Sequence, residues 1–243
     1  MVEYAIIIII MCLKFVVRLP WWDRREMTMP QYIPIMLNCE GWRIVIVGGG
    51  RVAERKVSSL LEGKAEIVVI SYKLTPWLKS RHTEGVISWF ERGYIEGDLE
   101  GARLVFATTD QVAVNEAVIM EATALRIPVN HAGDGERGSF ITPSMIRRGK
   151  LIIAVSTSGA GPRIARSLCH EIDKQYGDEY ETYIDFISNV RAFIKELVPD
   201  GSQRQSLFKL LAEMDILTEI REGNFLPWSE EEITSWISEY REV

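Results

Sequence analysis

The sequence predicts an α/β fold in which a doubly wound parallel sheet is followed by a helical C-terminal domain. Three observations lead to this prediction. Apolar runs rich in Val and Ile alternate with stretches of helix length between residues 43 and 129. A glycine-rich turn follows the first run directly, and beyond residue 163 apolar side chains recur at helical spacing. Such alternation is typical of βαβ units that build a parallel sheet.

Strands are expected where the runs are most apolar. Ile44–Val47 is entirely β-branched, which indicates a central parallel strand covered on both faces. The other strands are expected over Glu66–Ser71, Ala102–Ala107 and Ile127–Val129. Helices are expected between them, over residues 52–61, 75–81 and 111–125. This order predicts a doubly wound sheet.

The turn after the first strand fits the pattern G-x-G-x-x-A. Gly48 permits the tight turn, Gly50 lets a pyrophosphate approach the backbone, and Ala53 lets the next helix pack closely. The N-terminus of that helix would point its amides and dipole at the phosphates. The sequence therefore predicts a Rossmann-type dinucleotide site, whose cofactor-binding residues are Gly48, Gly49, Gly50, Arg51, Val52 and Ala53.

The second strand ends without the acidic residue that usually binds the adenosine ribose about 20 residues after the first glycine. Ser71, Tyr72 and Lys73 stand there instead. Ser71 can bond a ribose hydroxyl and is taken as a cofactor-binding residue, whereas Lys73 can attract a 2′-phosphate. The residues themselves leave NAD and NADP open.

The third strand ends in Thr108, Thr109 and Asp110. Doubly wound sheets bind ligands at the carboxyl ends of their strands, so we expect all three to contact the cofactor. Asp110 can also cap the following helix.

Charge is unevenly distributed along the chain. The net charge of −6 argues against general affinity for nucleic acids. Residues 137 to 166 hold six basic residues and no acidic one, so removing this +6 leaves −12 on the remainder. A local basic stretch on an acidic protein suits a small polyanionic ligand, although a solvated charge run is the plainer alternative.

Residues 1–29 are expected to be an N-terminal extension. The apolar run Ala5–Leu13 is too short for a membrane span of about 20 residues. Glu3 precedes it and no cleavage site follows, so a signal peptide fits poorly. We expect the natural start at Met27 or Met29; a strand, an interface helix and a membrane anchor are the alternatives.

The cysteines and histidines indicate no metal site. Three widely spaced cysteines give no disulfide framework and suit a reducing compartment, which predicts a cytoplasmic protein. The three histidines form no HxxxH or CxxC array, so a structural zinc site is not expected.

Four segments together resemble one family. They are GWRIVIVGGGRVAERKVSSLLEGKAEIVVIS (41–71), FATTDQVAVNEAV (106–118), VNHAGDGERGSFITPSMIRRG (129–149) and LIIAVSTSGAGPRIAR (151–166). The chain resembles precorrin-2 dehydrogenases, including the N-terminal half of siroheme synthase, from about Pro30 to Leu197, in the same order and spacing.

The resemblance implies oxidation of precorrin-2 to sirohydrochlorin, with NAD as the hydride acceptor, in siroheme biosynthesis. It also implies a homodimer whose active sites lie between the nucleotide domain and the partner's dimerisation region. The implied domains are an NAD-binding domain (30–142), a dimerisation segment (143–163) and a helical domain (164–243). Neither a nucleic acid nor a membrane is expected as a partner.

The substrate implied by the resemblance is an octacarboxylate macrocycle, which Arg can bind through its two-pronged guanidinium. The substrate-binding candidates, each with an alternative structural role, are Asn130, Arg137, Ser139, Ser156, Thr157, Ser158 and Arg163. Ser139 can equally serve the cofactor, and residues 156–158 can simply form the turn before a helix at Pro162.

A general base must take the proton that accompanies hydride removal. Where family members carry an Asp three residues after the Asn, this chain has Gly133, and Asp134 follows one residue later. Asp134 is the first candidate for the base and His131 the second. Asp134 in a glycine-rich turn and a structural His131 are the alternatives.

The C-terminal region reads as helical. One apolar stripe comprises Ile164, Leu168 and Ile172, and a longer one runs from Tyr183 to Leu197. Two more helices are expected over Gln203–Arg221 and Ser229–Tyr240, the latter capped by Ser229. These stripes are interpreted as core and subunit-packing surface.

Two other functions stay open on the sequence. A sirohydrochlorin ferrochelatase, alone or combined with the oxidation, would use Asp134 and His131 to take pyrrole protons. A non-catalytic module that senses NAD would bind nucleotide without turning over precorrin-2, and it leaves the basic stretch unexplained.

Overall fold

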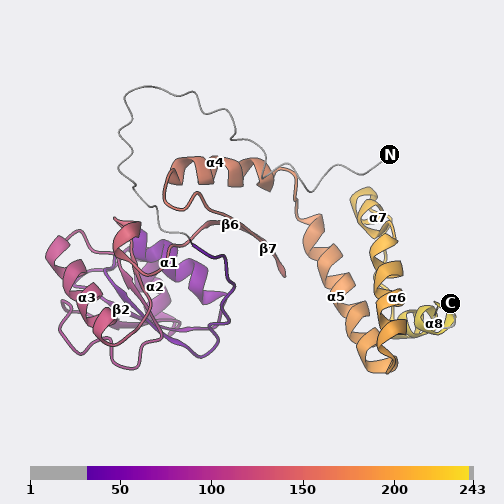
Figure 1. The fold of residues 1–243 in the computed structure, drawn as a ribbon, viewed down its shortest axis with the longest axis horizontal. Coiled ribbons are helices and arrows are strands. Elements are labelled where there is room, and N and C mark those ends of the chain that lie inside the picture. Colours follow the sequence, from indigo (N-terminus) through magenta and orange to yellow (C-terminus); the bar gives the residue numbers. More distant parts are fainter. Residues whose placement is uncertain (1–31, 241–243) are drawn as a thin grey trace. The chain divides into compact units, whose positions relative to one another are not determined.

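The computed structural model describes residues 32–240 (Figure 1). The predicted extension, residues 1–29, lies outside them. No helix within residues 32–240 is long and apolar enough to span a membrane. The half of the chain that is predicted to bind a nucleotide, called the nucleotide-binding half below, contains β1 (Arg43–Val47), α1 (Arg51–Leu61), β2 (Glu66–Ile70), α2 (Pro76–Thr83), β3 (Ser88–Phe90), β4 (Leu104–Ala107), α3 (Val112–Ala124) and β5 (Val129–His131).

Five parallel strands form the sheet in the order β3-β2-β1-β4-β5. β1 pairs with β2 on one side, where Ile44 is opposite Ile67, and with β4 on the other, where Ile44 is opposite Leu104. The chain thus changes direction of winding at β1, and this switch point is where open α/β sheets bind ligands. The doubly wound parallel sheet predicted from the sequence is confirmed.

Both faces of the sheet are covered by helices of the same half. α1 and α2 contribute Ala53, Val57 and Leu78 to the core on one face. α3 contributes Val118 and Ala122 to the core on the other face. The β1 side chains Ile44 to Ile46 are completely buried, as a central parallel strand requires.

The prediction for the last strand was wrong by two residues. α3 ends at Ala124, and the chain then turns through Arg126 (φ +56°), so that the amide of Ile127 donates back to Ala122 O at 2.8 Å and not to a neighbouring strand. β5 begins only at Val129, after Pro128, which has no amide hydrogen to donate. The shift places Asn130 and His131 inside the strand rather than after it, and Asn130 is 4% exposed. The short β3 was not predicted.

An antiparallel hairpin follows the sheet, formed by β6 (Ser144–Arg148) and β7 (Leu151–Val155) around Gly149, whose φ is +53°. It leads into α4 (Pro162–Asp173) and α5 (Glu179–Leu197). The half-buried Arg148 joins the hairpin to these helices through Asp173 (2.7 Å) and Asp178 (3.0 Å).

The last helices are α6 (Gly201–Glu213), α7 (Ile216–Glu222) and α8 (Glu230–Tyr240), which share one core with α5. The single helix predicted over residues 203–221 was wrong, because the extended backbone of Met214 (ψ 141°) separates α6 from α7. The cap by Ser229 is confirmed: its hydroxyl accepts from Glu232 N at 3.2 Å, and the Glu232 carboxylate accepts from Ser229 N at 2.7 Å.

The two predicted stripes differ in outcome. Phe186, Val190 and Ile194 are buried in the helical core, which confirms the longer stripe. The stripe on α4 is not core within the described chain, since Ile164 is 61% and Leu168 43% exposed. The buried side chains of α4 are instead the neighbouring Ala165 and Cys169.

Candidate functional site

The turn between β1 and α1 requires glycine at two successive positions. Gly48 has φ +120°, and a Cβ there would lie 2.5 Å from Thr108 Oγ1. A Cβ on Gly49 would lie only 2.1 Å from the carbonyl oxygen of Lys73. Any side chain at either position would therefore push the turn away from the ends of β2 and β4.

Gly50 stands in the opposite situation. A Cβ on Gly50 would meet no atom within 4 Å, so open space lies in front of this residue. α1 starts at the next residue without a side-chain cap, and its first backbone bond runs from Glu54 N to Gly50 O at 3.0 Å. The backbone amides that precede Glu54 are therefore not used by the helix itself, and such amides at a helix N-terminus can bind phosphate. Together with the close-packed Ala53, this arrangement fits the pyrophosphate of a dinucleotide.

The turn after β2 is held by three hydrogen bonds and carries no acidic side chain. Ser71 Oγ donates to Lys73 O at 2.9 Å and accepts from Lys73 N at 3.4 Å, and Trp89 Nε1 donates to Ser71 O at 2.9 Å. The hydroxyl proton of Ser71 is therefore used within the turn. Tyr72, 68% exposed, and the amine of Lys73 are the remaining side chains beside the expected ribose.

The end of β4 is held by a residue that the sequence did not single out. The buried Asn115 of α3 accepts from Thr109 N (3.2 Å) and Thr109 Oγ1 (2.8 Å) and donates to Thr109 O (2.9 Å). Thr108 Oγ1 donates to Val47 O at 2.9 Å, which ties β4 to β1 beside the glycine turn. The sequence offered one indication of this role: Asn115 is a polar residue in the first turns of a mainly apolar predicted helix.

The proposed cap by Asp110 was wrong. The residue that precedes α3 is Gln111, and no side-chain bond caps this helix. Thr109 Oγ1 instead accepts from Gln111 N at 3.1 Å. Asp110 remains an exposed side chain at the carboxyl edge of the sheet.

His131, at the carboxyl end of β5, is bound to the following turn. Its Nδ1 accepts from Asp134 N at 2.7 Å and from Gly133 N at 3.2 Å. Because an accepting nitrogen carries no proton, the neutral ring has its proton on Nε2. Nδ1 is thus occupied, and His131 presents a donor at Nε2. The exposed Asp134 begins a short 3₁₀ turn, in which Arg137 N donates to Asp134 O at 3.2 Å.

Arg137 and Ser139 lie at the other end of β5. Ser139 Oγ accepts from Val129 N at 2.8 Å and donates to Val129 O at 3.3 Å, so it anchors the start of the strand. Arg137 pairs with Glu116 at 2.9 Å. Arg137, Ser139 and Arg126 line a depression of about 430 Å³. No residue of the glycine turn lines this depression, so Arg137 and Ser139 are not brought together with the predicted cofactor site.

The basic stretch is largely neutralised by acids from outside it. Four of its six cations form ion pairs: Arg137 with Glu116, Arg147 with Glu62, Arg148 with Asp173 and Asp178, and Lys150 with Asp185. Of the six cations that were predicted to bind a polyanion, Arg163 and Arg166 are therefore the two whose charge is not neutralised by an ion pair in the described chain. Neither forms an ion pair with an acid in the described part of the chain.

The three hydroxyl residues before α4 form a turn. Ser156 Oγ accepts from Ser158 N and Thr157 Oγ1 accepts from Gly161 N, each at 3.1 Å. Ser158 adopts φ +52°, in the left-handed region. These bonds place Arg163 in the first turn of the helix and leave the hydroxyl protons of Ser156 and Thr157 available to a ligand.

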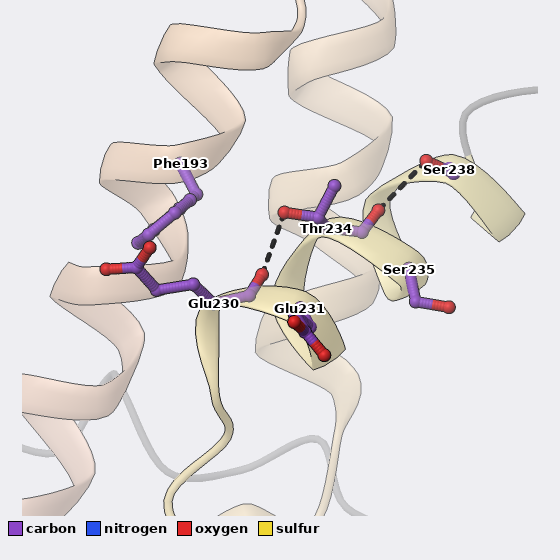
Figure 2. Close-up of a pocket in the computed structure, with 6 residues that line it drawn as sticks. All are labelled: Phe193, Glu230, Glu231, Thr234, Ser235 and Ser238. Atoms are coloured by element: carbon purple, nitrogen blue, oxygen red, sulfur yellow. Dashed lines mark hydrogen bonds between the residues drawn. The ribbon is translucent and has the colours of Figure 1, made fainter.

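A groove of about 510 Å³ between α5 and α8 has a different character (Figure 2). Glu230 and Glu231 line it, but Thr234 Oγ1 donates back to Glu230 O at 2.8 Å and Ser238 Oγ to Thr234 O at 2.9 Å. Because these hydroxyls bond their own helix, the groove offers a ligand little beyond exposed carboxylates. Its chemistry does not suit a polyanion.

Comparison with known proteins relates the chain to a family model and to curated proteins. Residues 35–144 match the family model described as "Putative NAD(P)-binding". Siroheme synthase of Gluconacetobacter diazotrophicus is 37% identical over 193 residues, and that of Methylobacillus flagellatus 36% over 173 residues. These alignments cover 76% and 71% of this chain but 40% and 37% of the relatives, so the chain spans about two fifths of their length.

A solved structure extends the similarity to the fold. SirC, a precorrin-2 dehydrogenase, superposes with a TM-score of 0.68 and 23% sequence identity, covering 87% of this chain and 100% of that one. With the glycine turn and the sequence motifs, these similarities show that the chain is related to the siroheme synthases over about two fifths of their length and that it shares the fold of SirC.

Proposed function

We propose that this chain oxidises precorrin-2 to sirohydrochlorin with NAD as hydride acceptor. The observation that carries the proposal is the glycine turn. Gly48 and Gly49 have no room for a side chain, while the space in front of Gly50 and the uncapped start of α1 is open. A dinucleotide is the ligand that uses both properties.

When bound, the nicotinamide would accept the hydride; the chain must position the reactants and take up a proton. The turn from Gly48 to Ala53 would bind the pyrophosphate, and Thr108 to Asp110 would lie along the cofactor at the sheet edge. Asp134 would accept the proton at its carboxylate. His131 would assist as a donor through Nε2, because its Nδ1 is already bonded to the Asp134 turn.

The choice of NAD over NADP rests on the family resemblance. Lys73 is the side chain at the ribose turn that would favour a 2′-phosphate, and Ser71 has its hydroxyl proton engaged. Affinities measured for both cofactors test this choice directly. A preference for NADP that disappears in Lys73→Ala would reverse it.

The substrate carboxylates would be bound by Arg163, assisted by the hydroxyls of Ser156 and Thr157. We also propose a homodimer formed through residues 143–163. In the described chain, β6 and β7 pair only with one another, and of their residues Ile146 alone is buried although the hairpin packs on α4. The partly exposed hairpin residues are the surface that a second chain would cover. Sedimentation analysis tests this: a mass of one chain at micromolar concentration would contradict the dimer.

The decisive assay is anaerobic incubation of the purified protein with precorrin-2 and NAD or NADP, followed by the absorbance of sirohydrochlorin. The expected result is product equal in amount to the cofactor reduced. Cofactor binding without product would favour the non-catalytic alternative. Adding ferrous ion afterwards measures chelation in the same sample. We place this reaction in the cytoplasm, consistent with the free thiols of Cys39 and Cys169.

A further inference from the structure

Lys56 lies on α1, four residues beyond Val52, and therefore on the same helix face. Its amine is half-buried, donates to Thr142 Oγ1, and lies 5.4 Å from the centre of the Phe106 ring. No ion pair joins Lys56 to a carboxylate within residues 32–240. Burial, with a smaller effect of Arg55, lowers the pKa of Lys56 to about 8.

Asn130 carries an unmet acceptor in the same region. Its Nδ2 donates to Phe140 O at 2.9 Å, which fixes the orientation of the amide and turns Oδ1 the other way. The residue is 4% exposed, and Oδ1 has no hydrogen-bond partner in the described structure. Leaving a buried acceptor without a hydrogen-bond partner is unfavourable, so the unpaired Oδ1 requires an explanation.

The two groups flank the same aromatic ring. Asn130 is the register partner of Phe106 on the neighbouring parallel strand, so both side chains project from the same face of the sheet. Phe140 contacts the Phe106 ring edge-on at 5.4 Å. Phe106 lies two residues before Thr108, which contacts the glycine turn. The amine and the orphaned oxygen therefore lie next to the candidate dinucleotide site.

We propose that Lys56 and Asn130 form the subsite for the carboxamide group of the nicotinamide. Lys56 would donate to the carboxamide oxygen, and Asn130 Oδ1 would accept from its NH₂ group. This inference rests on the proposed function, because it assigns the reactive end of the same cofactor. A carboxylate of the substrate would satisfy Lys56 but would face Asn130 Oδ1 with a second acceptor, so a group with both a donor and an acceptor fits better.

The test compares cofactor fragments in direct binding measurements. NAD and ADP-ribose, which lacks the nicotinamide, are titrated into the wild type, Lys56→Met and the control Arg55→Met. Arg55 is the exposed neighbour of Lys56 on the same helix. We expect Lys56→Met to weaken NAD binding about tenfold, the effect of one charge-assisted hydrogen bond, and to leave ADP-ribose unchanged. Arg55→Met should change neither.

The role of Asn130 is tested with 3-acetylpyridine adenine dinucleotide, in which a methyl group replaces the NH₂. The wild type should bind this analogue several-fold more weakly than NAD. The substitution Lys56→Met should lower the affinity for NAD and for the analogue by the same factor. Thermal melting of each variant reports folding, with Lys56→Gln as the second variant should Lys56→Met be unstable.

Equal losses for NAD and ADP-ribose, or no loss for either, would overturn the subsite. Turnover of precorrin-2 by the wild type is measured separately. A wild type that is active while Lys56→Met binds NAD normally would refute the subsite and leave the proposed function standing. A wild type that binds neither NAD nor NADP would refute both.

Discussion

The parallel sheet and the β6–β7 hairpin are stabilised in different ways. The sheet buries side chains on both faces beneath helices of its own half, and Val45 and Ile46 have no exposed surface. Among the strand residues of the hairpin, Ile146 alone is buried, and the structure around it depends on ion pairs. The sheet is thus covered on both faces within one chain, whereas most side chains of the described hairpin strands are partly exposed.

The largest expected effect concerns the glycine turn. Gly49→Ala should lower the free energy of unfolding by more than about 2 kcal/mol, because its Cβ would overlap the Lys73 carbonyl oxygen. Gly50→Ala should change it by less than about 0.5 kcal/mol, since nothing lies within 4 Å. Urea unfolding of both variants checks the contrast, and similar stabilities would show that the turn is not close-packed.

Asp134→Ala should lower precorrin-2 turnover about a hundredfold, the usual contribution of a general base. NAD affinity should stay near that of the wild type, because Asp134 lies beyond β5 rather than in the glycine turn. Steady-state kinetics beside NAD titration measure the two quantities. Glu96→Gln, an exposed carboxylate in another loop, is the control. Full activity of Asp134→Ala would exclude Asp134 as the base.

Arg148→Met tests how the hairpin is held. Its side chain is 20% exposed and contacts Asp173 and Asp178, so we expect a loss of about 1–3 kcal/mol, partly from the carboxylates left behind. The exposed pair of Lys209 and Glu213 serves as the control, because Lys209→Met should cost less than about 0.5 kcal/mol. Equal effects in denaturant titrations would mean that the Arg148 contacts add nothing.

The smallest effect is a pH dependence from Lys56. Its folded-state pKa is lowered from 10.5 to about 8, so the unfolded chain binds the extra proton between these values. The penalty for burying the charged amine is complete below pH 8 and is relieved as the pH rises to about 10.5. Between pH 8 and 10.5 the free energy of unfolding of the wild type should rise by about 1–2 kcal/mol relative to that of Lys56→Met, after allowance for solvent screening. Parallel pH profiles of stability would contradict the shifted pKa.

The sequence predicted most accurately the features that depend on local chemistry. The turn at Gly48 follows from backbone sterics, and the Ser229 cap follows from side chains three residues apart. Long-range partners could not be predicted in this way. The acids that neutralise Arg147 and Arg148 come from the residue after α1 and from the α4–α5 region, so a stretch that is basic in sequence is nearly neutral in space.

The predicted bounds of helices and strands were wrong where one local backbone preference outweighed another. β5 starts at Val129, two residues later than predicted, because the amide of Ile127 bonds back to Ala122 O at the end of α3 and Pro128 has no amide hydrogen. Asn130 therefore lies inside β5, where its side chain is buried and its Oδ1 has no hydrogen-bond partner in the described structure. The proposed carboxamide subsite depends on this unpaired oxygen. The break at Met214 had no glycine or proline to announce it. An apolar stripe such as Ile164 and Leu168 does not itself reveal whether its partner belongs to the same chain.

The most direct test of the central claim is calorimetric titration of NAD into the wild type and Gly50→Asp. The aspartate would place a carboxylate in the open space where the pyrophosphate is expected, without disturbing a packed neighbour. The account predicts saturable binding at one site per chain in the wild type and no detectable binding in a folded Gly50→Asp. Equal affinities in the two proteins would mean that the dinucleotide does not lie across this turn.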